Sequence, residues 1–68
     1  MPNNNILTKQ FLLKVLQYID KDDVSYSQKA NIVFDIFSEL NPQLTILDKL
    51  GYTIPQMVTD IKQKYQAL

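Results

Sequence analysis

The chain has 68 residues, enough for one small domain. It contains no cysteine and no histidine, so disulfides are excluded, and a metal ion would have only carboxylate and carbonyl oxygens as ligands. Seven lysines balance seven acidic residues and there is no arginine, so the charge neither attracts nucleic acid strongly nor supplies the guanidinium group that commonly recognises phosphates and bases. Self-association or a protein partner remains as a way to stabilise so short a chain.

The first helix is predicted over residues 8–20, with Thr8 as its cap. Residues 1–5 before it are polar and are expected to be a disordered tail, followed by a single helical domain over residues 6–68. Apolar residues occupy most of the positions from 11 to 19, too many for a single stripe, so this helix is expected to be covered on two sides. They are Phe11, Leu12, Leu13, Val15, Leu16, Tyr18 and Ile19.

The second predicted helix, residues 27–41, is the element around which the others are expected to pack, with Ser25 or Ser27 as its cap. It carries two adjacent apolar stripes, which indicates neighbours on at least two sides. The first stripe is Ala30, Val33, Phe34, Phe37 and Leu40, and the second is Ile32 and Ile36. The aspartates of the preceding turn do not follow the spacing of a calcium-binding loop, so no metal site is predicted.

The third predicted helix is short and covers residues 42–50. Asn41 is the expected cap and Pro42 the expected first helical residue. Gly51, the only glycine, stands where a left-handed C-terminal cap would fall. The apolar positions of this helix are Leu44, Ile46, Leu47 and Leu50.

The fourth predicted helix covers residues 54–67, with Thr53 as its cap and Pro55 in its first turn. Its apolar stripe is Met57, Val58, Ile61, Tyr65 and Leu68, and its polar face is Gln56, Thr59, Asp60, Gln63 and Lys64. No segment alternates with the period of a strand. The sequence therefore predicts an all-α, compact four-helix domain with helices near 8–20, 27–41, 42–50 and 54–67, arranged as a small bundle or an orthogonal array.

Catalysis is not expected, because the chain has neither histidine, the usual general base, nor cysteine, the strongest nucleophile among side chains. Asp35 and Glu39 lie four residues apart on one face of the second helix, but they are interpreted as part of its solvated polar strip. The single glycine leaves no phosphate-binding loop. No enzyme activity and no cofactor are predicted.

The first two helices carry more apolar positions than four short helices need for a core, which favours an interaction surface. We predict a small regulator or interaction module that acts through an apolar helix surface, as a homodimer or bound to a larger target protein. The expected partner-binding residues are Phe11, Leu12, Val15, Tyr18, Ile32, Ile36 and Phe37.

An alternative function is a small DNA-binding regulator, because residues 44–64 resemble a helix-turn-helix: a short helix, a glycine turn, a threonine cap and a second helix. Its candidate DNA-binding residues are Thr53, Gln56, Thr59, Lys62, Gln63 and Lys64. With so few lysines in the second helix the positive field is weak, so nucleic acid is the disfavoured partner.

The longest apolar run is three residues, so neither a membrane span nor a signal peptide is predicted, and no membrane partner is expected. The cytoplasm is the expected location. Lysine without arginine resembles the coding bias of an AT-rich genome, which suggests a bacterium or its phage.

Overall fold

Four helices follow one another along residues 8–68, the part of the chain that the structure, a computed structural model, describes. They are α1 (Lys9–Ile19), α2 (Tyr26–Leu40), α3 (Ile46–Leu50) and α4 (Ile54–Ala67). No strand occurs among these residues, and the predicted all-α, four-helix fold is confirmed. The tail predicted over residues 1–5 lies outside the described part.

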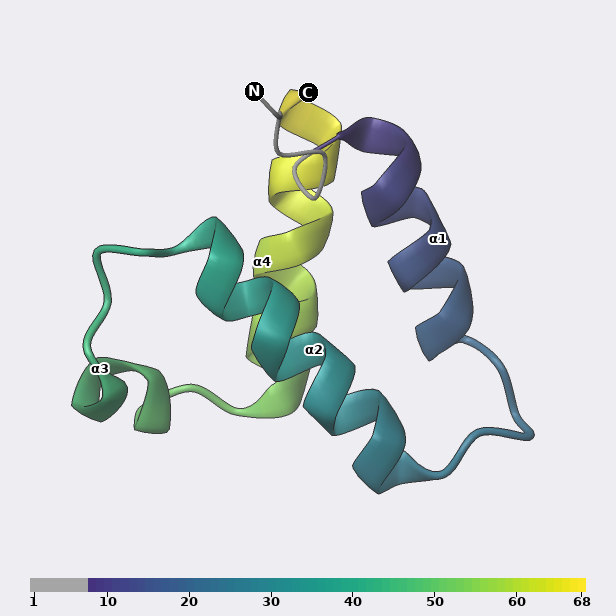
Figure 1. Cartoon of the computed structure of the whole chain (residues 1–68), viewed down its shortest axis with the longest axis horizontal. Helices are drawn as coiled ribbons and strands as arrows, with labels where there is room; N and C mark the ends of the chain where they lie inside the picture. The colour runs from purple at the N-terminus through teal and green to yellow at the C-terminus, as the bar shows by residue number, and fades with distance from the viewer. Residues whose placement is uncertain (1–7) are drawn as a thin grey trace, which may run out of the picture.

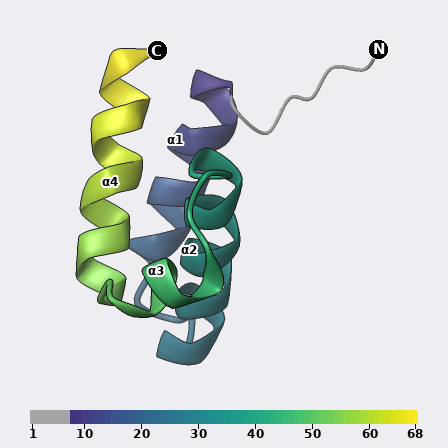
Figure 2. The same ribbon diagram turned by 90° about the vertical axis from the view of Figure 1, so that its left-hand side faces the viewer.

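Three of the helices form the body of the domain, because α2 packs against both α1 and α4, and α1 packs against α4. In Figures 1 and 2, α1 and α2 lie together on one side of the molecule and α4 covers them from behind. The short α3 lies on the side of α2 away from α1 (Figure 1). The prediction that the second helix has neighbours on two sides is thus confirmed.

The core consists of residues from the three long helices, at most 7% exposed, and α3 contributes none. They are Leu12, Val15, Val33, Ile36, Phe37, Met57 and Ile61. The ring of Tyr52, in the connection between α3 and α4, packs against Phe37 with 4.9 Å between the ring centroids. No helix within residues 8–68 is both long enough and apolar enough to cross a bilayer.

Hydroxyl caps fix where the three long helices begin. The Oγ1 of Thr8 accepts a hydrogen bond from the backbone N–H of Phe11, and Ser25, rather than Ser27, does the same for α2. Thr53 caps α4, whose first turn contains Pro55 as predicted. Each cap satisfies a backbone donor that a helix N-terminus otherwise leaves unpaired.

The predicted start of the third helix at Pro42 is wrong, because α3 begins only at Ile46. The side chain of Asn41 is turned inward, and its Nδ2 donates to the carbonyl oxygen of Phe37 at 2.9 Å, so Asn41 ends α2 instead of capping a new helix. The turn that follows leads to Thr45, which caps α3 through a reciprocal pair of hydrogen bonds with Asp48.

The left-handed cap predicted at Gly51 is also wrong. Gly51 has a φ of −79°, in the right-handed helical region. Its N–H donates to the carbonyl oxygen of Asp48 at 3.1 Å, so α3 ends in a tight right-handed turn that needs no positive φ.

The polar face predicted for α4 is only partly solvated, because the side chain of Asp60 is 22% exposed. One of its oxygens accepts a hydrogen bond from Asn41 Nδ2 at 2.9 Å, and the other pairs with Lys64 Nζ at 2.7 Å. Asn41 is itself 6% exposed. Asp60 therefore joins the end of α2 to α4.

Candidate functional site

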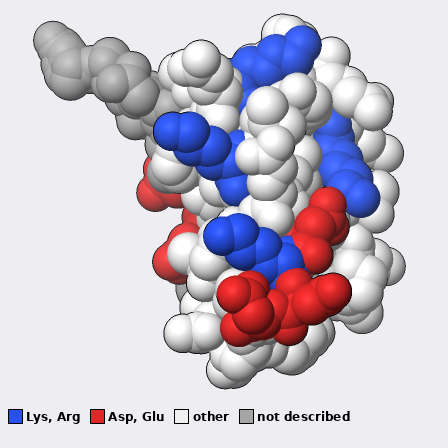
Figure 3. All heavy atoms as spheres, turned by 90° about the vertical axis from the view of Figure 1, so that its right-hand side faces the viewer, with Lys and Arg blue, Asp and Glu red and all other residues white. Residues whose placement is uncertain are grey.

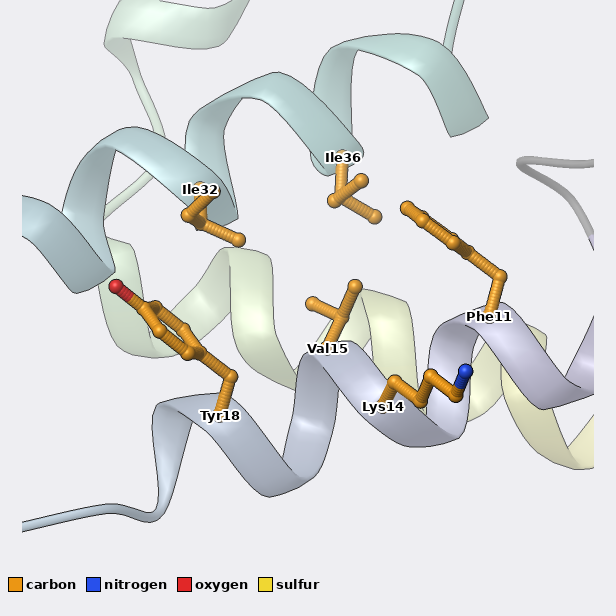
Figure 4. A pocket seen from close by; sticks show the side chains of 6 residues that line it. All are labelled: Phe11, Lys14, Val15, Tyr18, Ile32 and Ile36. Carbon is orange, nitrogen blue, oxygen red and sulfur yellow. The ribbon is translucent and has the colours of Figure 1, made fainter.

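An open apolar groove runs along the surface between α1 and α2, with a volume of about 240 Å³. Six side chains line it, four from α1 and two from α2 (Figure 4): Phe11, Lys14, Val15, Tyr18, Ile32 and Ile36. We call this the α1/α2 groove.

Helical spacing explains how the sequence builds the groove. Phe11, Val15 and Tyr18 follow each other at intervals of four and three residues along α1, so they share one face of that helix. Ile32 and Ile36 do the same along α2. Figure 4 shows that Phe11 lies across from Ile36 at one end of the groove and Tyr18 near Ile32 at the other.

The floor and the rim of the groove differ in exposure. Val15 and Ile36 form the floor and are 7% and 5% exposed, because they also pack in the core. Phe11 is 36% exposed, while Tyr18 and Ile32 are half-buried. An apolar partner could therefore remove further surface of Phe11, Tyr18 and Ile32 from water.

Five of the seven residues predicted to bind a partner line this groove, and two do not. Leu12 is 0% exposed and Phe37 is 1% exposed, so both belong to the core of the single chain and cannot touch a partner while it is folded. Each is adjacent in sequence to a groove residue, but it lies in the core cluster that the three long helices form. Periodicity alone does not separate these two faces.

Lys14 is the groove residue that sequence reasoning missed. It lies three residues after Phe11 and four before Tyr18, the spacing that places it beside them on α1. As a charged residue it is not one of the apolar positions of α1, although a lysine often lays its methylene stem along an apolar surface. Lys14 gives the α1 side of the groove a positive charge.

The α2 side of the groove carries two exposed acidic side chains. Asp35 is exposed and lies one residue before Ile36 and three after Ile32, which places it on the solvent side of that pair. Glu39, three residues after Ile36, is exposed as well. Among residues 8–68 the only ion pair joins Lys64 to Asp60, so neither Lys14 nor Asp35 has an ionic partner within the described chain.

Further acidic side chains mark one end of this side of the molecule. Figure 3 looks onto the side that carries α1 and shows acidic side chains gathered at its lower end. The turn between α1 and α2 supplies the exposed Asp20, Asp22 and Asp23, with Lys21 among them. Elsewhere the view shows separate lysines, and acidic side chains at its left-hand edge, among uncharged side chains (Figure 3).

The helix α3 presents a second apolar surface. Ile46, Leu47 and Leu50 are 63%, 81% and 71% exposed, whereas Leu44, before the helix, packs against the core. A helix of five residues has too little length to lay a stripe across α2 or α4, which explains why these side chains stay in solvent.

The residues of the DNA-binding alternative all lie at the start of α4 or along it, but several of their polar groups already have partners. Thr53 and Gln56 bond each other's backbone N–H groups, and Thr59 Oγ1 donates to a backbone carbonyl one turn earlier. Lys64 is paired with Asp60. Lys62 and Gln63 are exposed.

The groove contains few polar groups. Its polar groups are the amino group of Lys14 and the hydroxyl group of Tyr18, and the other side chains are apolar. Within residues 8–68, no three acidic side chains lie close enough together to hold a metal ion. Such a surface can bury apolar side chains and offer one positive charge at its edge.

The fold and the groove together define a small all-α domain with an apolar surface groove between two helices. Comparison of the chain with protein-family models, with curated proteins and with solved structures finds no match.

Proposed function

We propose that this chain is a small non-catalytic protein-binding module and that it binds its partner through the α1/α2 groove. The observation that carries the proposal is the convergence of five apolar side chains from two helices on one open groove. Contiguous apolar surface of this kind commonly marks a protein-binding site on a small domain.

The shape of the groove favours a helical segment as the bound element. An amphipathic helix that lies along a groove between two helices inserts side chains spaced three or four residues apart. Phe11 with Ile36, and Tyr18 with Ile32, would receive two such side chains at the two ends (Figure 4). In this proposal, binding itself alters the activity of the partner, and the chain acts as a regulator in the cytoplasm of a bacterium or its phage.

Photo-crosslinking from within the groove tests this function. We would replace Tyr18 with p-benzoylphenylalanine, which preserves an aromatic ring in the groove, and irradiate cells that produce the chain. The matched control carries the same group at Tyr26, which is 68% exposed and outside the groove. We expect a discrete adduct from position 18 and none of the same mass from position 26.

A second substitution shows whether the adduct depends on the groove. Adding Phe11→Ser should abolish the adduct from position 18, whereas adding Leu47→Ser, on the exposed surface of α3, should leave it intact. No adduct from position 18, or an adduct that Phe11→Ser does not reduce, would refute binding through the groove.

A further inference from the structure

We propose that the groove is occupied by a second copy of this chain, related to the first by a two-fold axis that runs along the groove, so that α1 of each copy packs on α2 of the other. The inference rests on the proposed function, because it names the partner of the same groove. It follows from the opposite charges on the two sides of the groove and from their positions along its length.

The charges lie at the same level of the groove. Lys14 immediately precedes Val15, which lies between the Phe11 end and the Tyr18 end. Asp35 falls between Ile32 and Ile36, which mark the same two ends on α2. Lys14 and Asp35 therefore stand on opposite sides of the groove near the middle of its length.

A two-fold axis parallel to the groove exchanges its two sides without moving either along its length. It places Lys14 of each copy opposite Asp35 of the other, which forms two symmetry-related ion pairs at the edges of the interface. Phe11 of each copy then faces Ile36 of the other copy, and Tyr18 faces Ile32, because these residues lie at the same levels of the groove (Figure 4).

Charge also selects this axis over the other face-to-face arrangement. A two-fold axis across the groove would place α1 on α1 and α2 on α2. Lys14 would then face its own copy, and Asp35 would face its own copy, with like charges opposed at both edges. The arrangement with α1 on α2 avoids both of these repulsions, while it brings the acidic turns between α1 and α2 of the two copies to the same end of the interface.

Size provides independent support for a second copy as the occupant. A chain of 68 residues without cysteine buries a small fraction of its surface on folding, and an oligomeric interface is one of the few ways to add to its core. Joining the two faces would remove further surface of Phe11, Tyr18 and Ile32 of both copies from water.

Charge reversal with light scattering tests the arrangement. The solution mass of the natural chain should change from monomer to dimer as its concentration rises. Lys14→Asp and Asp35→Lys should each raise the dimer dissociation constant by about tenfold, because each variant creates two like-charged pairs. The double variant restores opposite charges at both sites and should return the dissociation constant to within about threefold of the natural value.

Both positions are exposed, so these variants are expected to fold, which helical circular dichroism would verify. Leu47→Ser is the control and should not change the dissociation constant. The proposal is overturned if the natural chain stays monomeric at every concentration, if the double variant is no better than the single ones, or if only Leu47→Ser weakens association. A monomer that still gives a groove-dependent adduct with another protein from position 18 would overturn this dimer and leave the proposed function standing.

Discussion

The side chain of Asn41 joins the end of α2 to α4. Its amide nitrogen donates to the carbonyl oxygen of Phe37 and to the carboxylate of Asp60, each at 2.9 Å, and the residue is 6% exposed. Asn41→Ala would leave both acceptors without this donor. We expect the free energy of unfolding to fall by about 1 to 3 kcal/mol, as measured by urea denaturation.

Lys64→Ala is the control for that measurement. It removes the ion pair with Asp60, but the side chain of Lys64 is 36% exposed, so the loss should stay below about 1 kcal/mol. Equal losses in the two variants would show that the amide of Asn41 contributes no more than the exposed pair does.

Two phenylalanines differ in where they lie: Phe37 belongs to the core and Phe11 to the rim of the groove. Phe37 is 1% exposed and Phe11 is 36% exposed. Phe37→Ala should cost about 3 to 5 kcal/mol, a large part of the roughly 3 to 10 kcal/mol expected for a domain of this length. Phe11→Ala, measured at a concentration where the chain is monomeric, should cost markedly less. Similar urea midpoints for the two variants would contradict their assignment to core and rim.

At the scale of the element, the caps of α3 and α4 have the same chemistry and different consequences. Thr53 and Thr45 each form a reciprocal pair of hydrogen bonds with the residue three positions later. The helix α4 contributes Met57 and Ile61 to the core, whereas no residue of α3 is buried.

Loss of the Thr53 cap and loss of the Thr45 cap should therefore have different effects on the free energy of unfolding. Thr53→Ala should lower the global free energy of unfolding by about 1 kcal/mol. Thr45→Ala should leave global stability nearly unchanged and only accelerate amide hydrogen exchange within residues 46–50, because α3 can open while the rest stays folded. Exchange measured by NMR together with urea denaturation distinguishes the two effects. A global loss from Thr45→Ala equal to that from Thr53→Ala would contradict this description of α3.

The elements were predictable from sequence to the extent that their signals are local. Apolar spacing predicts the three long helices, and a hydroxyl residue before an apolar run predicts where they begin. The start of α3 was not predictable in this way. Asn41 and Pro42 are as good a signal for the start of a helix as Thr45, the residue that caps α3. The contact with Asp60, nineteen residues away, is what turns Asn41 inward.

The same limit applies to the groove. Sequence periodicity correctly selected Phe11, Val15, Tyr18, Ile32 and Ile36 as members of two apolar helices. It could not tell that Leu12 and Phe37 are buried in the core instead, because which apolar face is covered depends on where the other helices pack. It also passed over Lys14, since a charged residue is not counted in an apolar stripe.

At the scale of the whole molecule, the balanced charge leads us to expect no binding to DNA. Lysine and acidic residues are equal in number, and Lys64 on α4 is already paired with Asp60. We expect no shift of a duplex DNA fragment by the chain at about 50 mM salt, where sequence-independent binding is strong for proteins that neutralise many phosphates. Binding at that salt concentration that weakens steeply as salt rises would revive the DNA-binding alternative.

The whole molecule is proposed to be a symmetric pair joined through the α1/α2 groove, and isoleucine methyl groups report on this directly. Ile32 and Ile36 lie in the groove, Ile61 is in the core at 0% exposed, and Ile46 is 63% exposed on α3. The most direct measurement is a dilution series of methyl NMR spectra of the natural chain. We predict that the methyl signals of Ile32 and Ile36 shift with concentration while those of Ile46 and Ile61 stay in place. No shift at Ile32 and Ile36, or a shift confined to Ile46, would contradict a dimer formed through the groove.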